Sequence, residues 1–269
     1  MNNLWAVIYG IIQGITEFLP VSSSGHLALI PYFAKIEDPG LIFDLAMHLG
    51  TSLAVAIYFY KDLFRLISGV ATSFLPKRKI DGYALNFIIA TLFTGLGGLL
   101  IKGFAEQYGR NEVFIAFNMA FFGFLLYWSD RGEESSQKLM ESLKGWKKAS
   151  VIGLLQILAI FPGVSRSGIT ITTSRMLGLS RVESASFSFL LSLPLILAGA
   201  GLKFYELSKT STAFNYSLCA VGIVVSFFVG LLTIHLFLKV LKKIKFSYFM
   251  YYRFAIAVGI LYFYYSNYN

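Results

Sequence analysis

Long stretches without a charged side chain constrain this chain more than any other feature of its sequence. Helices of about 20 apolar residues cross about 30 Å of hydrocarbon, and four uncharged stretches are long enough or nearly so: residues 83–101, 113–128, 184–202 and 216–238. Two more qualify although Asp44, His48 and Arg253 interrupt them: residues 41–60 and 246–265. The chain is 56% hydrophobic and only 14% charged, whereas a soluble domain has roughly a quarter charged residues. We therefore predict an all-α polytopic membrane protein with six transmembrane helices.

The basic residues are concentrated in three of the predicted loops. Loops 61–82, 130–149 and 239–247 hold 14 of the 23 lysines and arginines. Because basic loops remain in the cytoplasm, both termini are expected outside, and the net charge of +9 requires no nucleic-acid partner. The single cysteine, Cys219, excludes an internal disulfide and a cysteine-built metal site. Since the first basic residue is Lys35, no signal peptide is expected.

Two shorter apolar runs predict broken helices inside the bundle. Residues 4–15 and 150–161 are each twelve residues long, end at a cluster of proline, glycine and serine, and resume as a second short segment. Runs of this length are typical of re-entrant elements. Irregular backbone at membrane depth is tolerated only where protein or a wet cavity surrounds it. We therefore expect two re-entrant helix pairs in the interior, where function is to be sought.

These two broken elements also reveal an internal repeat. Residues 10–25 align without gaps on residues 153–168, and seven of the sixteen positions are identical. Each half contains one re-entrant pair followed by three spans, an odd number of crossings, so the halves have opposite topology. We predict one membrane domain over residues 1–269 in which repeats of approximately 1–130 and 150–269 are joined by the basic loop 130–149. The re-entrant pairs would meet near the midplane, as in inverted-repeat transporters.

The first broken element carries a set of reactive side chains. Gln13 and Glu17 are four residues apart and share a helix face. After Pro20, Ser22 or Ser23 is suited to cap the next helix, whose free N–H groups favour an anion. Ser23 and His26 offer a nucleophile and a proton carrier. In the alternative interpretation the serines only cap the helix, His26 lies at the lipid interface, and Glu17 is solvated in a crevice.

The second broken element places Arg166 between Ser165 and Ser167, shortly before Thr170. A guanidinium has donors that match two phosphate oxygens, and hydroxyl and backbone N–H groups can complete an oxyanion site. The alternative is a cytoplasmic loop with one positive-inside arginine. The repeat favours the first interpretation, because it would bring Arg166 against the side chains of the first element. A carboxylate, a hydroxyl, an imidazole and a guanidinium in one cleft indicate phosphoryl chemistry.

The two motifs resemble those of the undecaprenyl-diphosphate phosphatase family, also called the bacitracin-resistance family. They are Gln13-xxx-Glu17-Phe-Leu-Pro-Val-Ser-Ser-Ser-Gly-His26 and Pro162-Gly-Val-Ser-Arg166-Ser-Gly-Ile-Thr170, and the resemblance covers the whole chain. It implies hydrolysis of undecaprenyl diphosphate with a divalent cation, Mg²⁺ or Ca²⁺. It also implies a catalytic set that consists of Glu17, Ser23, His26 and Arg166. The residues implied to line the bound phosphate are Ser22, Ser165, Ser167 and Thr170. Many members have Glu where this chain has Gln13, which weakens a metal site formed by Glu17 and Gln13.

The expected mechanism uses Arg166 to hold the terminal phosphate and a cation at Glu17 to absorb charge. Either Ser23 attacks with His26 as its base, which we favour, or His26 activates a water. Ser24, Asp44 and His48 are secondary candidates for the site, whereas Arg253 is expected to snorkel or pack near a helix end.

The expected partners are the polyprenyl diphosphate substrate, membrane lipids and a second copy of the chain in a homodimer. The expected location is the bacterial inner membrane, with the site facing outward. Because inverted repeats with broken helices are a transporter architecture, a polyprenyl phosphate flippase is the alternative function. A transporter needs the arginine and the serines but has no need of a nucleophile and its base.

Overall fold

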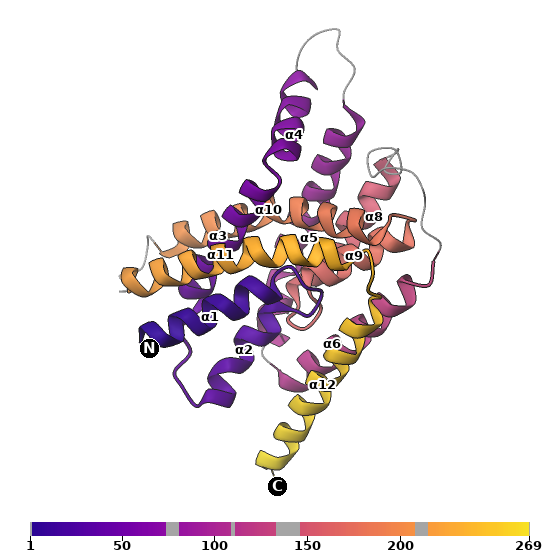
Figure 1. Cartoon of the computed structure of the whole chain (residues 1–269). Helices are drawn as coiled ribbons and strands as arrows, with labels where there is room; N and C mark the ends of the chain where they lie inside the picture. Colours follow the sequence, from indigo (N-terminus) through magenta and orange to yellow (C-terminus); the bar gives the residue numbers. More distant parts are fainter. Residues whose placement is uncertain (1, 74–80, 109–110, 133–145, 208–214, 269) are drawn as a thin grey trace.

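The computed structural model describes residues 2–73, 81–108, 111–132, 146–207 and 215–268, and over these ranges the chain is helical without any strand (Figure 1). The described part of the first half contains six α-helices: α1 (Asn3–Thr16), α2 (Ser23–Ala34), α3 (Leu41–Tyr58), α4 (Tyr60–Ser73), α5 (Gly82–Tyr108) and α6 (Glu112–Ser129). The described part of the second half contains five α-helices and a short 3-10 helix: α8 (Trp146–Gln156), η1 (Ile157–Ile160), α9 (Arg166–Met176), α10 (Arg181–Leu207), α11 (Tyr216–Val240) and α12 (Ser247–Tyr268).

Four of these helices, α5, α6, α10 and α11, are long and apolar enough to cross a membrane. They correspond to the four uncharged stretches, so the prediction of a multi-pass helical membrane protein is confirmed. The helix α12 occupies the stretch predicted as 246–265 but does not reach the same apolarity, since it is rich in tyrosine. The structure thus supports four spans, or five with the bent pair described next, and leaves six as a prediction.

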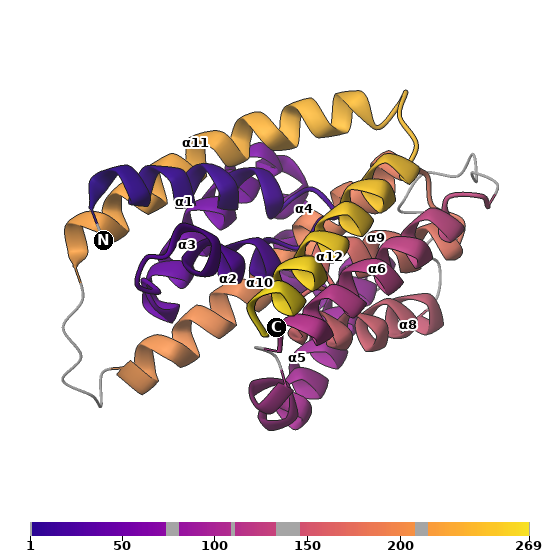
Figure 2. The same ribbon diagram turned by 90° about the horizontal axis from the view of Figure 1, so that it is seen from below.

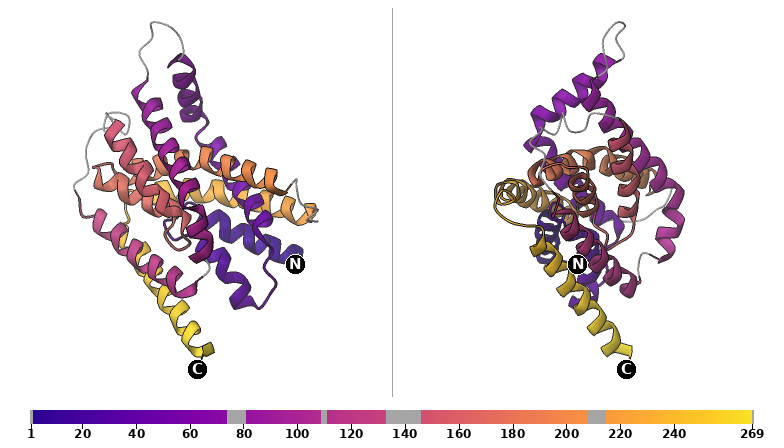
Figure 3. Two further views of the ribbon diagram at one scale, coloured as in Figure 1. Left: turned by 180° about the vertical axis from the view of Figure 1, so that it is seen from behind. Right: turned by 90° about the vertical axis from the view of Figure 1, so that its right-hand side faces the viewer.

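The helices α3 and α4 qualify as a span only together, and they are bent by 85° at their junction. The loop predicted for 61–82 was therefore wrong at its start, because Tyr60–Ser73 is helical. Its apolar residues occupy one face of α4 and its charged residues the other, which is typical of a helix lying at an interface. The two views in Figure 3 show α4 and the beginning of α5 projecting together from one side of the bundle.

Of the predicted basic loops, residues 74–80 and 133–145 lie outside the described residues. The predicted loop 130–149 was too long at its end, because α8 begins at Trp146. The basic loop predicted for 239–247 is confirmed between α11 and α12, although the helix α11 extends to Val240.

Close helix contacts hold the first helix of each predicted repeat against a helix of the other half. The helix α1 lies along α11, as Figures 1 and 2 show, and α8 packs on α5. A Cβ added at Gly10 or Gly14 would lie 2.8 Å from Val225 or Val229 of α11. At Gly153, the position aligned with Gly10, it would lie 2.6 Å from the carbonyl oxygen of Ala90 in α5. Small residues allow such close approach of helices in membranes.

The two predicted breaks are confirmed, and their backbones match. The helix pairs α1–α2 and α8–α9 are each interrupted, in the second case after η1. Ser22 and Ser165 precede α2 and α9 with φ of 73° and 72°. Each Oγ accepts a hydrogen bond from the N–H of the glycine three residues later, Gly25 or Gly168. These serines are the N-caps of the second helix of each pair.

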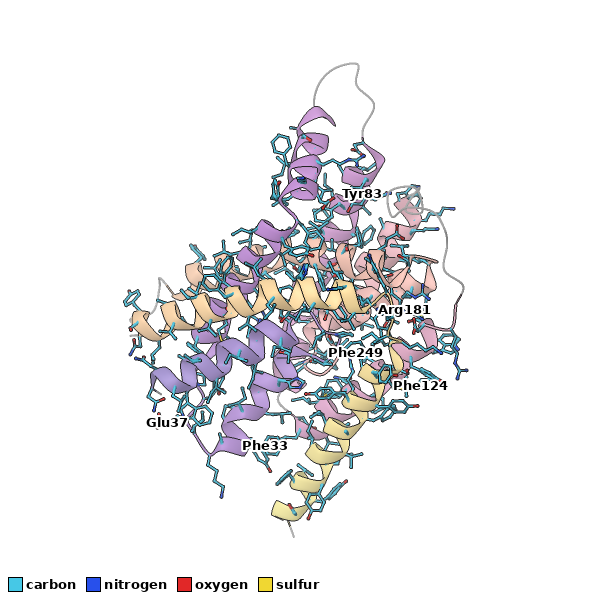
Figure 4. All side chains as sticks on the ribbon, in the orientation of Figure 1. Phe33, Glu37, Tyr83, Phe124, Arg181 and Phe249 are labelled. Atoms are coloured by element: carbon cyan, nitrogen blue, oxygen red, sulfur yellow. The ribbon has the colours of Figure 1, made fainter. Side chains whose placement is uncertain are left out.

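A buried carboxylate fastens α6, α10 and α12 together at one end of the bundle. Asp130 accepts hydrogen bonds from Arg181 Nε at 2.6 Å and from the backbone N–H of Phe246 at 3.0 Å. Arg175 Nε lies 3.6 Å from the same carboxylate. Figure 4 shows Arg181 close to the start of α12. These contacts keep α12 beside α6, which is needed for the site described next.

Candidate functional site

Glu17 is the centre of the candidate site. Its side chain lies in the first break, directly after α1, and is only 5% exposed. Its Oε2 accepts hydrogen bonds from Ser23 Oγ at 2.7 Å and from Gln13 Nε2 at 3.0 Å. Since a buried charge is costly without compensation, these donors stabilise Glu17 in its ionised form.

The second break supplies the opposite charge. Arg166, the first residue of α9, donates from Nη2 to Glu17 Oε1 at 2.5 Å and from Nη1 to the carbonyl oxygen of Ser188 in α10 at 3.2 Å. Arg166 is 15% exposed, so the pair lies below the surface yet within reach of an entering ligand. The structure therefore brings together Glu17, Ser23 and Arg166, which are as far as 149 residues apart in sequence.

Gln13 and His48 complete this group from α1 and α3. His48 Nδ1 lies 2.8 Å from Gln13 Nε2 and 3.3 Å from Glu17 Oε2. Gln13 is fully buried, and its Oε1 has no hydrogen-bond partner within the described part of the chain. A buried carbonyl oxygen of this kind is available to a cation or a ligand donor. Asp44, the other polar residue predicted on this span, precedes His48 by one turn of α3.

His26 does not form the expected pair with Ser23. Its Nδ1 lies 2.8 Å from the carbonyl oxygen of Ser22, and its Nε2 lies 2.7 Å from the hydroxyl of Tyr252 in α12. The two rings are stacked. Both ring nitrogens are therefore engaged away from Ser23, whose hydroxyl contacts Glu17 instead. The single turn between Ser23 and His26 suggested a contact, but the side chains leave α2 toward different neighbours.

The remaining predicted serines and the threonine hold the two breaks in shape. Ser22 Oγ also accepts from the N–H of Gly163 in the other break at 3.2 Å and lies 3.4 Å from Ser24 Oγ. From the second break, Ser167 donates to the carbonyl oxygen of Leu19 at 3.0 Å.

The residues flanking Ser167 on α9 are bonded within the second element. Ser165 Oγ lies 3.2 Å from Ser167 Oγ. Thr170 donates to Gln156 Oε1 at 2.6 Å and lies 2.8 Å from the carbonyl oxygen of Arg166. Phosphate contacts of Ser22, Ser165, Ser167 and Thr170 remain predictions.

Comparison with known proteins identifies the family of this chain. The family model described as bacitracin resistance protein BacA matches residues 6–259. The chain belongs to this family. It is 39% identical over 264 residues to undecaprenyl-diphosphatase 2 of Stutzerimonas stutzeri, covering 97% of this chain and 98% of the relative. It is 41% identical to undecaprenyl-diphosphatase of Caldicellulosiruptor bescii over 98% of both chains, and 42% identical to that of Saccharophagus degradans over 97% of both.

One residue of this BacA-family chain was misjudged from sequence. Arg253 was expected to snorkel or pack near a helix end; it packs in the second turn of α12 and is fully buried, so the snorkelling alternative is wrong, and its contacts with the two breaks were not foreseen. Its guanidinium donates to backbone carbonyl oxygens of both breaks and of α6. The available signal was a single arginine inside an apolar stretch, because a charge at membrane depth marks a functional site by default.

The charges of the site are suited to a phosphorylated ligand with help from a cation. Glu17 and Arg166 neutralise each other, so the pair alone leaves little charge for a diphosphate. Within the described residues no cluster of three His, Cys, Asp or Glu side chains is placed to hold a metal. Mg²⁺ often has only one or two protein ligands, with waters and substrate phosphates completing its shell. The Glu17 carboxylate and the unpartnered Gln13 Oε1 fit that requirement.

Proposed function

We propose that this protein hydrolyses undecaprenyl diphosphate to undecaprenyl phosphate and inorganic phosphate. The reaction recycles the carrier lipid of cell-wall synthesis and confers resistance to bacitracin. The observation that carries the proposal is the contact of Glu17 with both Ser23 and Arg166. This contact brings a hydroxyl, a carboxylate and a guanidinium together, and such a set supports a nucleophile, a proton acceptor and a phosphate-binding group. The names of the three relatives agree with this activity.

The hydroxyl of Ser23 is the proposed nucleophile. Its oxygen forms a bond to the terminal phosphorus, its proton passes to Glu17, and the bond from phosphorus to the bridging oxygen breaks. The lipid monophosphate departs with the electrons of that bond. Water then cleaves the phosphoserine, which releases inorganic phosphate and restores the hydroxyl. Glu17, 2.7 Å from Ser23 Oγ, thus takes the role of base that the sequence suggested for His26.

Arg166 binds the terminal phosphate in this proposal. Its guanidinium offers two parallel donors to phosphate oxygens and exchanges part of its contact with Glu17 for the ligand. Glu17 and Gln13 would hold a divalent cation, Mg²⁺ or Ca²⁺, which neutralises negative charge on the diphosphate when bound. The free N–H groups at the start of α9 add further donors for an anion.

The membrane arrangement is also part of the proposal. We infer two inverted repeats from the matched caps Ser22 and Ser165 and from the crossed packing of α1 on α11 and α8 on α5, and a total of six spans stays a prediction. In Figure 1 the candidate spans α10 and α11 run across the view, with the start of the chain toward their left end and the basic segment between α11 and α12 at their right end. Under the positive-inside rule the right end faces the cytoplasm, which supports the proposal that the termini and the first break face the outside of the inner membrane. A homodimer remains a prediction.

Phosphate release tests the proposal. Purified protein in detergent is given a short-chain polyprenyl diphosphate with Mg²⁺ or with a chelator. We expect cation-dependent release that falls about a thousandfold or more in Arg166→Ala, as loss of a phosphate-binding arginine does elsewhere. Loss of release in Ser23→Ala identifies the serine as nucleophile, whereas survival identifies water. No release by folded protein that still binds the lipid would contradict the phosphatase and favour the flippase.

A further inference from the structure

Arg253 connects the two breaks through a single side chain. Nη1 donates to the carbonyl oxygen of Pro20 in the first break at 3.2 Å. Nη2 donates to those of Gly163 at 2.7 Å and Val164 at 3.2 Å in the second. The guanidinium also donates to the carbonyl oxygens of Met119 and Asn118 in α6. Five backbone acceptors from three segments thus surround one buried cation.

The two carbonyls at the ends of this bridge occupy equivalent positions. In the gap-free alignment of residues 10–25 on 153–168, Pro20 corresponds to Gly163. Each is two residues before the capping serine of its break, Ser22 or Ser165. Nη1 therefore binds the carbonyl oxygen of Pro20, and Nη2 binds the carbonyl oxygen at the aligned position, Gly163. A planar guanidinium offers donors in a fixed fork, so Arg253 fixes the separation of these two carbonyls.

The bridge lies where the backbone is strained. Ser22 and Ser165 both have positive φ, at 73° and 72°, which non-glycine residues rarely adopt. Such conformations persist only when the surroundings impose them. The residue after each strained serine carries the chemistry, Ser23 in the first break and Arg166 in the second. A contact that fixes the carbonyl groups just before the strained serines therefore also fixes the backbone positions from which the side chains of Ser23 and Arg166 project.

A neighbouring residue on α6 makes the complementary contact. Asn118 Nδ2 donates to the carbonyl oxygen of Pro162 in the second break at 3.0 Å. Arg253 of α12, in the second half, donates to Pro20 of the first break. The third span of each predicted repeat thus holds the break of the other repeat. No carboxylate pairs with Arg253 among the described residues, so backbone carbonyls are its compensation.

We propose that Arg253 is a positioning residue that holds the two breaks in register and thereby aligns Ser23 with Arg166. This inference rests on the proposed phosphatase function. Arg253 acts through the backbone of the breaks and does not contact the substrate. A misplacement of reacting groups by about 1 Å can lower a rate by about a hundredfold, so the bridge matters for the reaction rate more than for lipid binding.

Arg253→Lys separates positioning from folding. Lysine keeps the positive charge on a slightly shorter side chain but has one nitrogen, which cannot serve the Pro20 and Gly163 carbonyls in the same fork. We expect kcat per folded molecule to fall about tenfold to a hundredfold, with KM within about threefold and a similar melting temperature. A second variant, Gly123→Ala, leaves Arg253 in place but adds a Cβ 3.2–3.3 Å from its side chain. We expect a smaller loss of kcat there.

Gly259→Ala is the matched control, because a Cβ on this residue of α12 has nothing within 4 Å. Its kcat should equal that of wild type. Hydrogen exchange provides a readout that does not depend on activity. Peptides covering residues 17–28 and 161–172 should exchange faster together in Arg253→Lys, while α11 exchanges as in wild type.

Two results would overturn the inference. One is Arg253→Lys with wild-type kcat and unchanged exchange in both breaks. The other is a loss of activity that only follows the fraction of folded protein. If wild-type protein releases no phosphate, the proposed function fails, and coupled exchange of the two breaks still tests whether Arg253 holds them together.

Discussion

At the first break Glu17 and Ser23 lie at the positions where the second break has Ile160 and Arg166. The capping serines, the glycines they bind and the glutamines at Gln13 and Gln156 are shared. Both capping serines have the same positive φ. The backbone of the two breaks is therefore conserved within the chain, and the reactive side chains differ. One break provides a carboxylate and a hydroxyl, and the other provides a guanidinium.

This difference indicates a division of labour. Two identical breaks would place two carboxylates or two guanidinium groups side by side, and like charges in a buried site repel. The observed pair combines opposite charges, so each stabilises the other before a ligand arrives. The shared glutamines differ in the same way. Gln13 binds Glu17 and lies against His48, whereas Gln156 donates to Thr94 Oγ1 at 3.0 Å and accepts from Thr170.

The largest effect is expected where the aligned positions differ most. Glu17→Gln removes the proton acceptor of Ser23 and should lower kcat by about 10²–10⁴-fold, the range for general base catalysis. Ile160→Gln, at the aligned position, should change kcat by less than about threefold, since Ile160 belongs to η1 and takes no part in the proposed chemistry. Phosphate release at saturating lipid measures both. Equal losses would show that the breaks are not chemically distinct.

The glutamines give the next contrast. Gln13→Glu adds a second carboxylate beside Glu17 and the unpartnered position of Oε1, so a cation should bind more tightly. We expect the Mg²⁺ concentration for half-maximal release to fall about tenfold, equivalent to about 1.4 kcal/mol. Gln156→Glu should leave the cation requirement unchanged and lower stability, because its bond to Thr94 is lost. If the Mg²⁺ concentration for half-maximal release fell in Gln156→Glu and not in Gln13→Glu, the assignment of the cation site to Gln13 would be contradicted.

The caps should behave alike, since their geometry is shared. Ser22→Ala and Ser165→Ala each lose a cap worth about 1 kcal/mol and leave a positive φ on a residue that disfavours it. Glycine loses the cap as well but accepts the positive φ. Melting temperatures should therefore fall further for alanine than for glycine at both sites. If only one of Ser22→Ala and Ser165→Ala lowered the melting temperature, the two capping sites would not be equivalent.

The smallest effect concerns a contact that only the first break has. Tyr252→Phe removes the hydroxyl that lies 2.7 Å from His26 Nε2 and keeps the ring stack. A single hydrogen bond contributes about 1 kcal/mol, so kcat should fall less than about fivefold. His26→Gln should produce a loss of similar size if His26 only supports the break. A loss near that of Glu17→Gln would restore His26 as a catalytic base.

Local patterns in the sequence were sufficient to predict most of the fold. The uncharged stretches located α5, α6, α10 and α11, because span length and apolarity follow directly from the thickness of a bilayer. The proline, glycine and serine clusters located both breaks. The 85° bend between α3 and α4 was missed. The charges of Lys61 and Arg65 suggested a loop, and the sequence alone did not show how neighbouring helices pack against α4.

The site was predictable as a set of residues but not as a set of contacts. The repeat indicated that Glu17 and Arg166 would meet. It gave no information on side-chain direction, which is why His26 was paired with Ser23 and the contact of His48 with Gln13 was not foreseen. Arg253 is 233 residues from the Pro20 carbonyl it binds. Such a contact depends on how α12 packs on α6, and one sequence does not encode that packing in any local pattern.

We infer that the two breaks form one site through Glu17 and Arg166. A double-mutant cycle on kcat/KM tests it, with Glu17→Gln, Arg166→Lys and the double variant, each normalised to folded protein. Residues in contact show coupling of about 0.5–3 kcal/mol, so the double variant should lose far less than the product of the single losses. Losses that multiply would mean that the two side chains act independently, and would contradict a shared site.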